Sequence, residues 1–161
     1  MNLSPRLLAI GRLILPGSRV ADVGTDHGHL PVWLLTKGRA SFVVATDVAQ
    51  GPLETAKRSA ARAGITSGIA FRLADGLLAV SSEEVDTVVI AGMGGETIMG
   101  ILEGAPWLKA EPYRIILQPQ SKIPELMDFL LVEGYCILEQ HLVEEAERRY
   151  TIFEVTAWDY S

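Results

Sequence analysis

Four aspartates stand at the ends of short apolar, β-branched segments, where side chains from several strands could act together. Asp22 and Asp26 flank a turn after the first segment, Asp47 ends the second, and Asp75 follows the third. Ligands of an open parallel sheet bind in the crevice outside the carboxyl ends of its strands, so these carboxylates are expected to share one site. Carboxylates accept hydrogen bonds and attract cations, which favours a ligand rich in hydroxyls, amines or positive charge.

The first turn, residues 22–28, is glycine-rich, which by itself is a weak signal. Gly24 permits a tight turn, and Gly28 lets the next helix begin close to the strand. Asp26 stands where a dinucleotide-binding turn has its second glycine, and a carboxylate there would repel a pyrophosphate. The same carboxylate is compatible with S-adenosylmethionine, which lacks phosphate and carries a sulfonium and an ammonium. The alternative is that Asp22 and Asp26 only cap the turn and the following helix.

Asp47 and Asp75 extend this pattern to a nucleoside site. Asp47 comes 23 positions after Gly24, the distance at which an acid receives ribose hydroxyls in this architecture. Its alternative role, as a cap for a helix starting near Gly51-Pro52, would place the cap several residues early. Asp75 could accept from an adenine amine while Gly76 leaves room for the ring, although Asp-Gly alone is a common turn dipeptide.

Residues 92–95, Gly-Met-Gly-Gly, are expected to form a bare loop after the central strand. Such a backbone permits close approach by a methionine tail or a planar base, although it could be only a tight turn into a helix. An Asp, Asn or Ser followed by Pro-Pro, typical of enzymes that methylate exocyclic amines, is absent here. A ring nitrogen such as adenine N1 already has an in-plane lone pair and needs mainly alignment and exclusion of water.

Gln118 and Gln120, expected to follow the fifth strand, offer amides that can both donate and accept, which suits a base edge. Equally, they could be residues of a proline turn with no role in binding.

The elements that must position these residues alternate between strand and helix. An opening helix runs from Ser4-Pro5 to Pro16-Gly17. Five buried strands are predicted at residues 20–23, 42–46, 69–73, 85–91 and 113–117, and helices at 30–36, 52–63, 96–102 and 123–132, with no more than one turn at 75–80. This alternation predicts an α/β fold with a parallel sheet covered by helices on both faces.

Two long strand-like runs, residues 135–143 and 150–158, close the pattern without a helix between them. They are expected to pair as an antiparallel hairpin at one sheet edge. Seven strands with a closing hairpin is the layout of Rossmann-like class I methyltransferases, whereas a nicotinamide dehydrogenase half would end with another crossover.

Composition narrows the class of protein further. A chain of 161 residues suits one domain, here residues 1–161, and no apolar run approaches the roughly 20 residues that a bilayer requires. We therefore expect a cytoplasmic protein without membrane contact. The single cysteine, Cys136, argues against a zinc cluster or other metal site. The net charge of −6 argues against strong unassisted binding to a polyanion.

Taken together, these motifs resemble the bacterial tRNA (adenine-22)-N1-methyltransferase family. The resemblance spans nearly the whole chain and is carried by Leu3-Ser4-Pro5-Arg6-Leu7, the Asp-His turn at 21–27, Asp47 with Gly51-Pro52, Ala56-Lys57-Arg58, Asp75-Gly76-Leu77, residues 90–95 and Leu117-Gln118-Pro119. It implies a class I fold, S-adenosylmethionine as methyl donor and methylation of an adenine N1 in tRNA. Members of the family carry a C-terminal helical extension, and this chain stops at Ser161, so we expect weak tRNA binding.

The expected site follows from the motifs and the resemblance together. The donor is expected to contact Asp22, Gly24, Asp26, His27, Gly28, Asp47, Asp75, Gly76, Gly92, Met93 and Gly94. The substrate is expected to contact Arg6, Lys57, Arg58, Gln118 and Gln120. Asp26 and His27 are the nearest candidates for a catalytic role, because methylated adenine is cationic. Two other functions stay open: a small-molecule methyltransferase, and a non-catalytic module that binds the donor.

Overall fold

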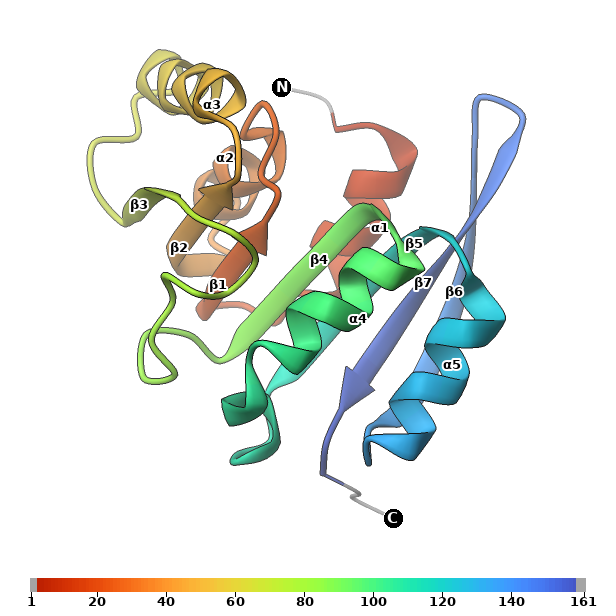
Figure 1. Ribbon diagram of the computed structural model, residues 1–161. Helices are drawn as coiled ribbons and strands as arrows, with labels where there is room; N and C mark the ends of the chain where they lie inside the picture. Colours follow the sequence, from red (N-terminus) through yellow and green to blue (C-terminus); the bar gives the residue numbers. More distant parts are fainter. Residues whose placement is uncertain (1–2, 159–161) are drawn as a thin grey trace.

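The computed structural model describes residues 3–158 as a seven-stranded sheet with helices on both faces (Figure 1). The strand order is β3-β2-β1-β4-β5-β7-β6. In chain order the elements are α1 (Pro5–Leu13), β1 (Ser18–Val23), α2 (His29–Thr36), β2 (Ala40–Asp47), α3 (Gln50–Arg62), β3 (Ile69–Leu73), β4 (Thr87–Gly94), α4 (Gly95–Glu103), a 3-10 helix (Pro106–Lys109), β5 (Arg114–Ser121), α5 (Ile123–Val132), β6 (Cys136–Glu145) and β7 (Arg148–Thr156).

The first five strands are parallel, and the direction of chain progression across the sheet reverses between β1 and β4. From β1 the chain moves outward through β2 to β3, then returns to place β4 on the other side of β1 and continues to β5. Connections from neighbouring strands diverge at such a switch point, which leaves a crevice at the carboxyl ends. The crevice therefore lies over β1 and β4.

Alternating side chains of the central strands feed two separate cores. Val88 and Ile90 of β4 pack on one face with buried residues of α4 and α5, whereas Val89 packs on the other face with residues of α1 and α2. Figure 1 shows α4 and α5 together on the nearer face of the sheet. A strand that is apolar on both faces is typical of a parallel sheet covered by helices, so the predicted fold class is confirmed.

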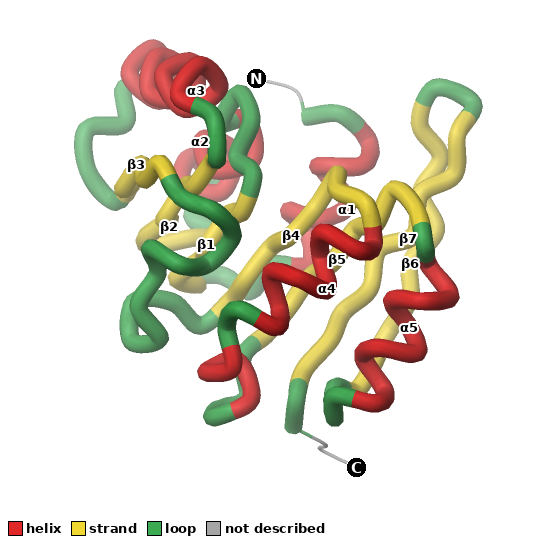
Figure 2. The backbone as a smooth tube through the Cα atoms, in the orientation of Figure 1, coloured by secondary structure: helices red, strands yellow, loops and turns green. Residues whose placement is uncertain are grey.

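The closing hairpin sits at the predicted edge. β7 pairs antiparallel with both β5 and β6, which leaves β6 outermost. Figure 2 shows this ribbon extending beyond the rest of the sheet near the N-terminal helix. Its tip reaches the site, because Glu145 Oε1 accepts a hydrogen bond of 2.9 Å from the backbone N–H of Arg6 in the first turn of α1.

The local start signals work as expected at α1. Ser4 is the N-cap, its hydroxyl accepts from the N–H of Leu7 at 3.4 Å, and Pro5 fills the first position. The other predicted helices begin and end within two residues of their expected bounds. Residues 75–80 form turns and no helix, and the 3-10 helix Pro106–Lys109 was not predicted.

Two expectations about strands were wrong. β3 is not a buried strand, since its residues are half-buried or exposed at a sheet edge where only β2 pairs with it. β4 and β5 extend further than expected and include residues 92–94 and 118–121, for which the sequence predicts loops. The two segments stay paired there, with Ala91 opposite Gln118 and Gly94 opposite Ser121, and the register shifts around Met93 absorb the irregular backbone.

Within residues 3–158, no helix has the length and apolarity to cross a bilayer.

Candidate methyl-donor site

A cavity of about 620 Å³ opens at the carboxyl ends of the parallel strands. Its walls come from the turn after β1, the end of β2, the loop after β3, the end of β4 and the first residues of α1 and α4. Eleven of the sixteen residues expected at the site line it: Arg6, Asp22, Gly24, Asp26, His27, Asp47, Asp75, Gly76, Gly92, Met93 and Gln120.

Asp22 is the buried acid of the site. Only 5% of its surface is exposed, and its Oδ2 accepts a hydrogen bond of 2.9 Å from the Thr25 hydroxyl. Burial raises the pKa of Asp22 from 3.8 to about 7, although the hydrogen bond from Thr25 lowers it. The negative charges of Asp47 and Asp26 raise this pKa further, and the charge of Arg6 lowers it. A buried carboxyl with these neighbours would be stabilised in its charged form by a cationic ligand.

The turn after β1 is shaped by backbone conformations that suit glycine. Gly24 has a φ of +71°, and a Cβ there would collide with the methyl group of Met93 across the cavity. Gly28 has a φ of +74°, and a Cβ added there would lie only 2.8 Å from the Ala56 side chain of α3. Gly28 does not line the cavity. Its role is to let α2 and α3 approach each other.

Asp26 and His27 lie at the open side of the cavity. Asp26 has a φ of +57°, and its side chain is 73% exposed. His27 Nε2 lies 3.7 Å from Asp26 Oδ1, and the His27 side chain is 56% exposed. The N-cap of α2 is Gly28, with no side-chain hydrogen bond, so neither Asp22 nor Asp26 caps that helix. This removes the helix-capping alternative for both residues.

Asp47 is held by two backbone donors. Its Oδ2 accepts from the N–H of Asp26 at 3.2 Å, and its Oδ1 accepts from the N–H of Ala49 at 3.0 Å. Ala49, not Asp47, is the N-cap of α3. Each carboxylate oxygen can accept more than one hydrogen bond, so Asp47 is oriented and keeps capacity for ligand hydroxyls.

Asp75 and Gly76 continue the wall after β3. The Asp75 side chain is exposed, and the backbone carbonyl of Gly76 accepts from the buried Thr46 hydroxyl at 3.4 Å. The facing wall is α4, where Thr97 and Ile101 line the cavity one helical turn apart. These two residues are not among those predicted from the sequence, although their spacing of four and their position after the glycines of 92–95 were available signals.

The β4 and β5 side of the cavity is built differently. Gly92 and Met93 line the cavity, but Gly94 is the N-cap of α4 and a Cβ there would lie 3.0 Å from the Ser121 hydroxyl. Gly94 therefore makes room for the end of β5. Gln118 is fully buried and does not line the cavity, because its Oε1 accepts from Arg6 Nη1 at 2.9 Å and from the N–H of Gly92 at 3.0 Å.

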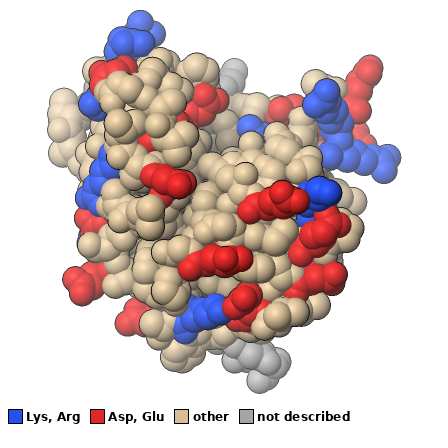
Figure 3. All heavy atoms as spheres, viewed as in Figure 1, with Lys and Arg blue, Asp and Glu red and all other residues tan. Residues whose placement is uncertain are grey.

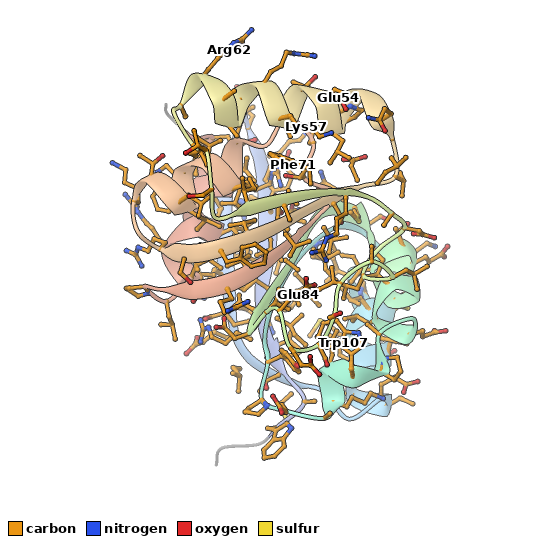
Figure 4. All side chains as sticks on the ribbon, turned by 90° about the vertical axis from the view of Figure 1, so that its left-hand side faces the viewer. Glu54, Lys57, Arg62, Phe71, Glu84 and Trp107 are labelled. Atoms are coloured by element: carbon orange, nitrogen blue, oxygen red, sulfur yellow. The ribbon has the colours of Figure 1, made fainter. Side chains whose placement is uncertain are left out.

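Lys57 and Arg58 stand outside the cavity on α3. Lys57 Nζ pairs with Glu54 at 3.1 Å, and Arg58 Nη2 donates to the Thr55 hydroxyl at 3.2 Å. Figure 4 shows Arg62 pointing away from the body of the molecule at the far end of this helix. Figure 3 shows basic side chains over α3 and the tip of the hairpin, with acidic side chains over the face between them. In the part of the chain that the structure describes, no group of His, Cys, Asp or Glu side chains could hold a metal ion.

The comparisons with known proteins agree with this geometry. A family model described as a methyltransferase domain matches residues 3–153. The tRNA (adenine(22)-N(1))-methyltransferase of Bacillus subtilis is 33% identical over 99% of this chain, which spans 67% of that relative's length. A Streptococcus pneumoniae relative solved with S-adenosyl-L-methionine has a TM-score of 0.92 at 34% identity, over 99% of this chain and 75% of that one.

A third relative was solved with the reaction product of the donor. M. capricolum TrmK in complex with S-adenosyl-homocysteine has a TM-score of 0.86 at 28% identity, over 99% of this chain and 70% of that one. The acids and glycines of the cavity fit the same cofactor, since they offer acceptors and negative charge to a nucleoside with a sulfonium and an ammonium. The chain belongs to the tRNA (adenine-22)-N1-methyltransferase family and is an S-adenosylmethionine-dependent methyltransferase.

Proposed function

We propose that this domain, residues 1–161, transfers a methyl group from S-adenosylmethionine to N1 of an adenine in tRNA, at position 22, in the cytoplasm. The observation that carries the proposal is the composition of one cavity, in which a row of carboxylates on the β1–β3 side faces a bare backbone segment at the end of β4. Membership in the family supports the same reaction.

The carboxylates bind the donor in this proposal. Asp47, already oriented by two backbone N–H groups, receives the ribose hydroxyls, and Asp75 accepts from the adenine amine. Asp22 and Asp26 provide negative charge for the ammonium and sulfonium, while Gly24 leaves space against Met93. When bound, the donor supplies an electrophilic methyl group on a positively charged sulfur.

The other side of the cavity aligns the acceptor. Gly92 and Met93 form a wall with little side-chain bulk, on which a planar base can approach the methyl group in line. The N1 lone pair forms the new N–C bond as the S–C bond breaks, and the charge moves from sulfur to the base. Adenine N1 carries no proton, so the transfer step needs no general base. In this proposal Asp26, with His27 beside it, stabilises the cationic product, which the negative charge of a carboxylate at the open side of the cavity supports.

Binding of tRNA by this chain is proposed to be weak and salt-dependent. The net charge is −6, and Lys57 and Arg58 are already engaged within α3. Neutralisation of phosphates supplies most non-specific affinity for nucleic acid, so few such contacts give low affinity that falls as salt rises.

A methyl-transfer assay tests the proposal. Unmodified tRNA with adenine at position 22 is incubated with the protein and the donor, and N1-methyladenine is detected by mass spectrometry and by a reverse-transcription stop at that position. The same tRNA with guanine at position 22 is the control, and we expect methylation of the first alone. Methylation of a small-molecule panel without tRNA would favour a small-molecule acceptor, and donor binding without any transfer would favour a binding module.

A further inference from the structure

The side-chain amides of Gln118 and Gln120, on the β4–β5 side of the cavity, are fixed in orientation because the groups beside them can only donate or only accept a hydrogen bond. Arg6 Nη1 and the backbone N–H of Gly92 approach the same atom of Gln118, at 2.9 and 3.0 Å. A guanidinium and a backbone N–H can only donate. The atom they share must therefore be the amide oxygen of Gln118, and its amide nitrogen must point the other way.

The amide nitrogen of Gln118 fixes the next side chain in turn. It donates to the carbonyl of Pro119 at 3.2 Å and to the side chain of Gln120 at 3.2 Å. A donor requires an acceptor, so the atom of Gln120 that faces Gln118 is its oxygen, Oε1. The amide nitrogen of Gln120 then points away from Gln118, and among residues 3–158 no group accepts a hydrogen bond from it. Gln120 is exposed and lines the cavity, whereas Gln118 is fully buried.

We infer that Gln120 is a specificity-determining residue that presents a hydrogen-bond donor to the base being methylated, and that Arg6 and Gln118 are positioning residues that hold it in that orientation. The inference rests on the proposed function. The group on the base that faces the Gln120 donor must be a hydrogen-bond acceptor. When N1 of adenine faces the methyl group, the neighbouring exocyclic amine can only donate, which leaves the ring nitrogens N3 and N7 as acceptors for Gln120.

This arrangement also explains the role of Arg6. Its guanidinium is committed to Gln118, and its backbone N–H is committed to Glu145 of the hairpin. The three segments that meet here, α1, the β4–β5 ends and the tip of the β6–β7 hairpin, are far apart in sequence, and Arg6 contacts both of the other two.

The first experiment measures kcat/KM with tRNA whose target adenosine is replaced by 7-deazaadenosine or by 3-deazaadenosine. Each analogue removes one acceptor and leaves N1 in place. We expect one analogue to lower kcat/KM roughly 3- to 10-fold in the wild-type protein, the effect of one hydrogen bond. Gln120→Leu should lower kcat/KM for adenosine by a similar factor and should make the protein indifferent to that analogue. Any change in the reactivity of N1 itself cancels when the two proteins are compared on the same substrate.

Gln140→Leu is the matched control, since Gln140 is an exposed glutamine on β6 that does not line the cavity. It should keep the wild-type response to both analogues. Calorimetry with S-adenosyl-homocysteine should give unchanged affinity for Gln120→Leu. A loss of that affinity would assign the Gln120 donor to the carboxylate of the methionine moiety and overturn the inference.

The second experiment tests the positioning role through Gln118→Glu. The carboxylate keeps the acceptor for Arg6 and Gly92 but loses the donor that orients Gln120. We expect this variant to reproduce the kcat/KM loss and the analogue response of Gln120→Leu. The double variant should be no worse than either single variant, because coupled residues are not additive. Losses that multiply would show that Gln118 acts separately.

Failure of this inference is distinct from failure of the proposed function. If the wild-type protein methylates N1 of adenine and responds to neither deaza analogue, Gln120 does not read the base, while the reaction stands. If the wild-type protein does not methylate tRNA at all, the proposed function fails first, and the inference falls with it. Because Gln120 is exposed, its variants are expected to fold. The first experiment therefore tests the inference even if Gln118→Glu fails to fold.

Discussion

The two sides of the cavity are built on different principles. On the β1–β3 side, each acid stands in or beside the turn that ends its own strand, and the hydrogen bonds of Asp22 to Thr25 and of Asp47 to Ala49 and Asp26 span 2 to 21 positions. On the β4–β5 side, the contacts join distant segments, with Arg6 and Gln118 separated by 112 positions and Arg6 and Glu145 by 139. The donor side is thus largely locally encoded, while the acceptor side depends on the completed fold.

The largest expected effect on stability comes from placing a side chain on the donor side at Gly24. Gly24→Ala puts a Cβ on a left-handed backbone, which should lower the free energy of unfolding by roughly 1–2 kcal/mol, while the terminal methyl group of Met93 can move away from the new side chain. Chemical denaturation measures this. Gly94→Ala is the matched change on the acceptor side, where φ is −62° and the neighbour is a hydroxyl at 3.0 Å, and it should cost less than about 1 kcal/mol. Equal losses at the two positions would contradict the difference between the sides.

Removing the carboxylate of Asp47 should separate donor binding from the fold. Asp47→Ala is expected to weaken binding of S-adenosyl-homocysteine by roughly 1.5–3 kcal/mol, the range for hydrogen bonds to a charged group. Isothermal calorimetry gives the affinity, and circular dichroism checks the fold. Asp128→Ala, at an exposed position on α5, is the control and should bind normally. Undiminished affinity in Asp47→Ala would remove Asp47 from the donor site.

The pH dependence of donor binding should report on Asp22. Its pKa of about 7 means that the unliganded site is largely protonated below neutrality, and a cationic ligand favours the charged form. Affinity should therefore rise with pH, by at most about tenfold per unit below pH 7, and level off above it. Calorimetry of S-adenosylmethionine between pH 5.5 and 8 measures the rise, and Asp22→Asn should abolish it.

The same shift has the opposite sign for the stability of the unliganded protein. Between pH 3.8 and about 7 the folded state keeps a proton that the unfolded state has released, so the contribution of Asp22 to the free energy of unfolding falls as pH rises through this window. In Asp22→Asn that contribution should vanish. A stability that rises through the window because of Asp22 would contradict the assigned cause, burial.

The smallest effect on the cavity is expected from α3. Lys57→Glu combined with Arg58→Glu should leave the affinity for S-adenosyl-homocysteine unchanged, because neither side chain lines the cavity. If these residues meet phosphates, the slope of log affinity for tRNA against log salt should fall by at most about 2. Filter binding at several salt concentrations measures the slope. A loss of donor affinity in the double variant would show that Lys57 or Arg58 contributes to donor binding, which their positions outside the cavity do not predict.

The sequence predicted best what local patterns encode. Ser4-Pro5 marked the start of α1, and apolar runs located every strand, because capping and side-chain periodicity act over a few residues. The donor-side acids were located for the same reason. What failed was the ending of β4 and β5: Gly92 and Gln118 look like turn residues in isolation, and only their pairing across strands keeps them in the sheet. For the same reason Gln118 was expected in the cavity, where it does not lie, whereas Thr97 and Ile101 of α4 were missed although their spacing of four was visible in the sequence.

The hydrogen bond from the Arg6 backbone to Glu145 has a kinetic consequence. It closes a loop of 139 positions, and contacts of such long sequence separation form late, since chain entropy must be lost before they stabilise anything. The Arg6–Gln118 hydrogen bond of the acceptor side requires α1 to dock, and the hairpin holds α1 through Glu145, whereas the turns of the donor side can form earlier. During refolding, the protein should regain the ability to bind S-adenosyl-homocysteine before it regains methyl transfer, and Glu145→Ala should widen the interval between the two.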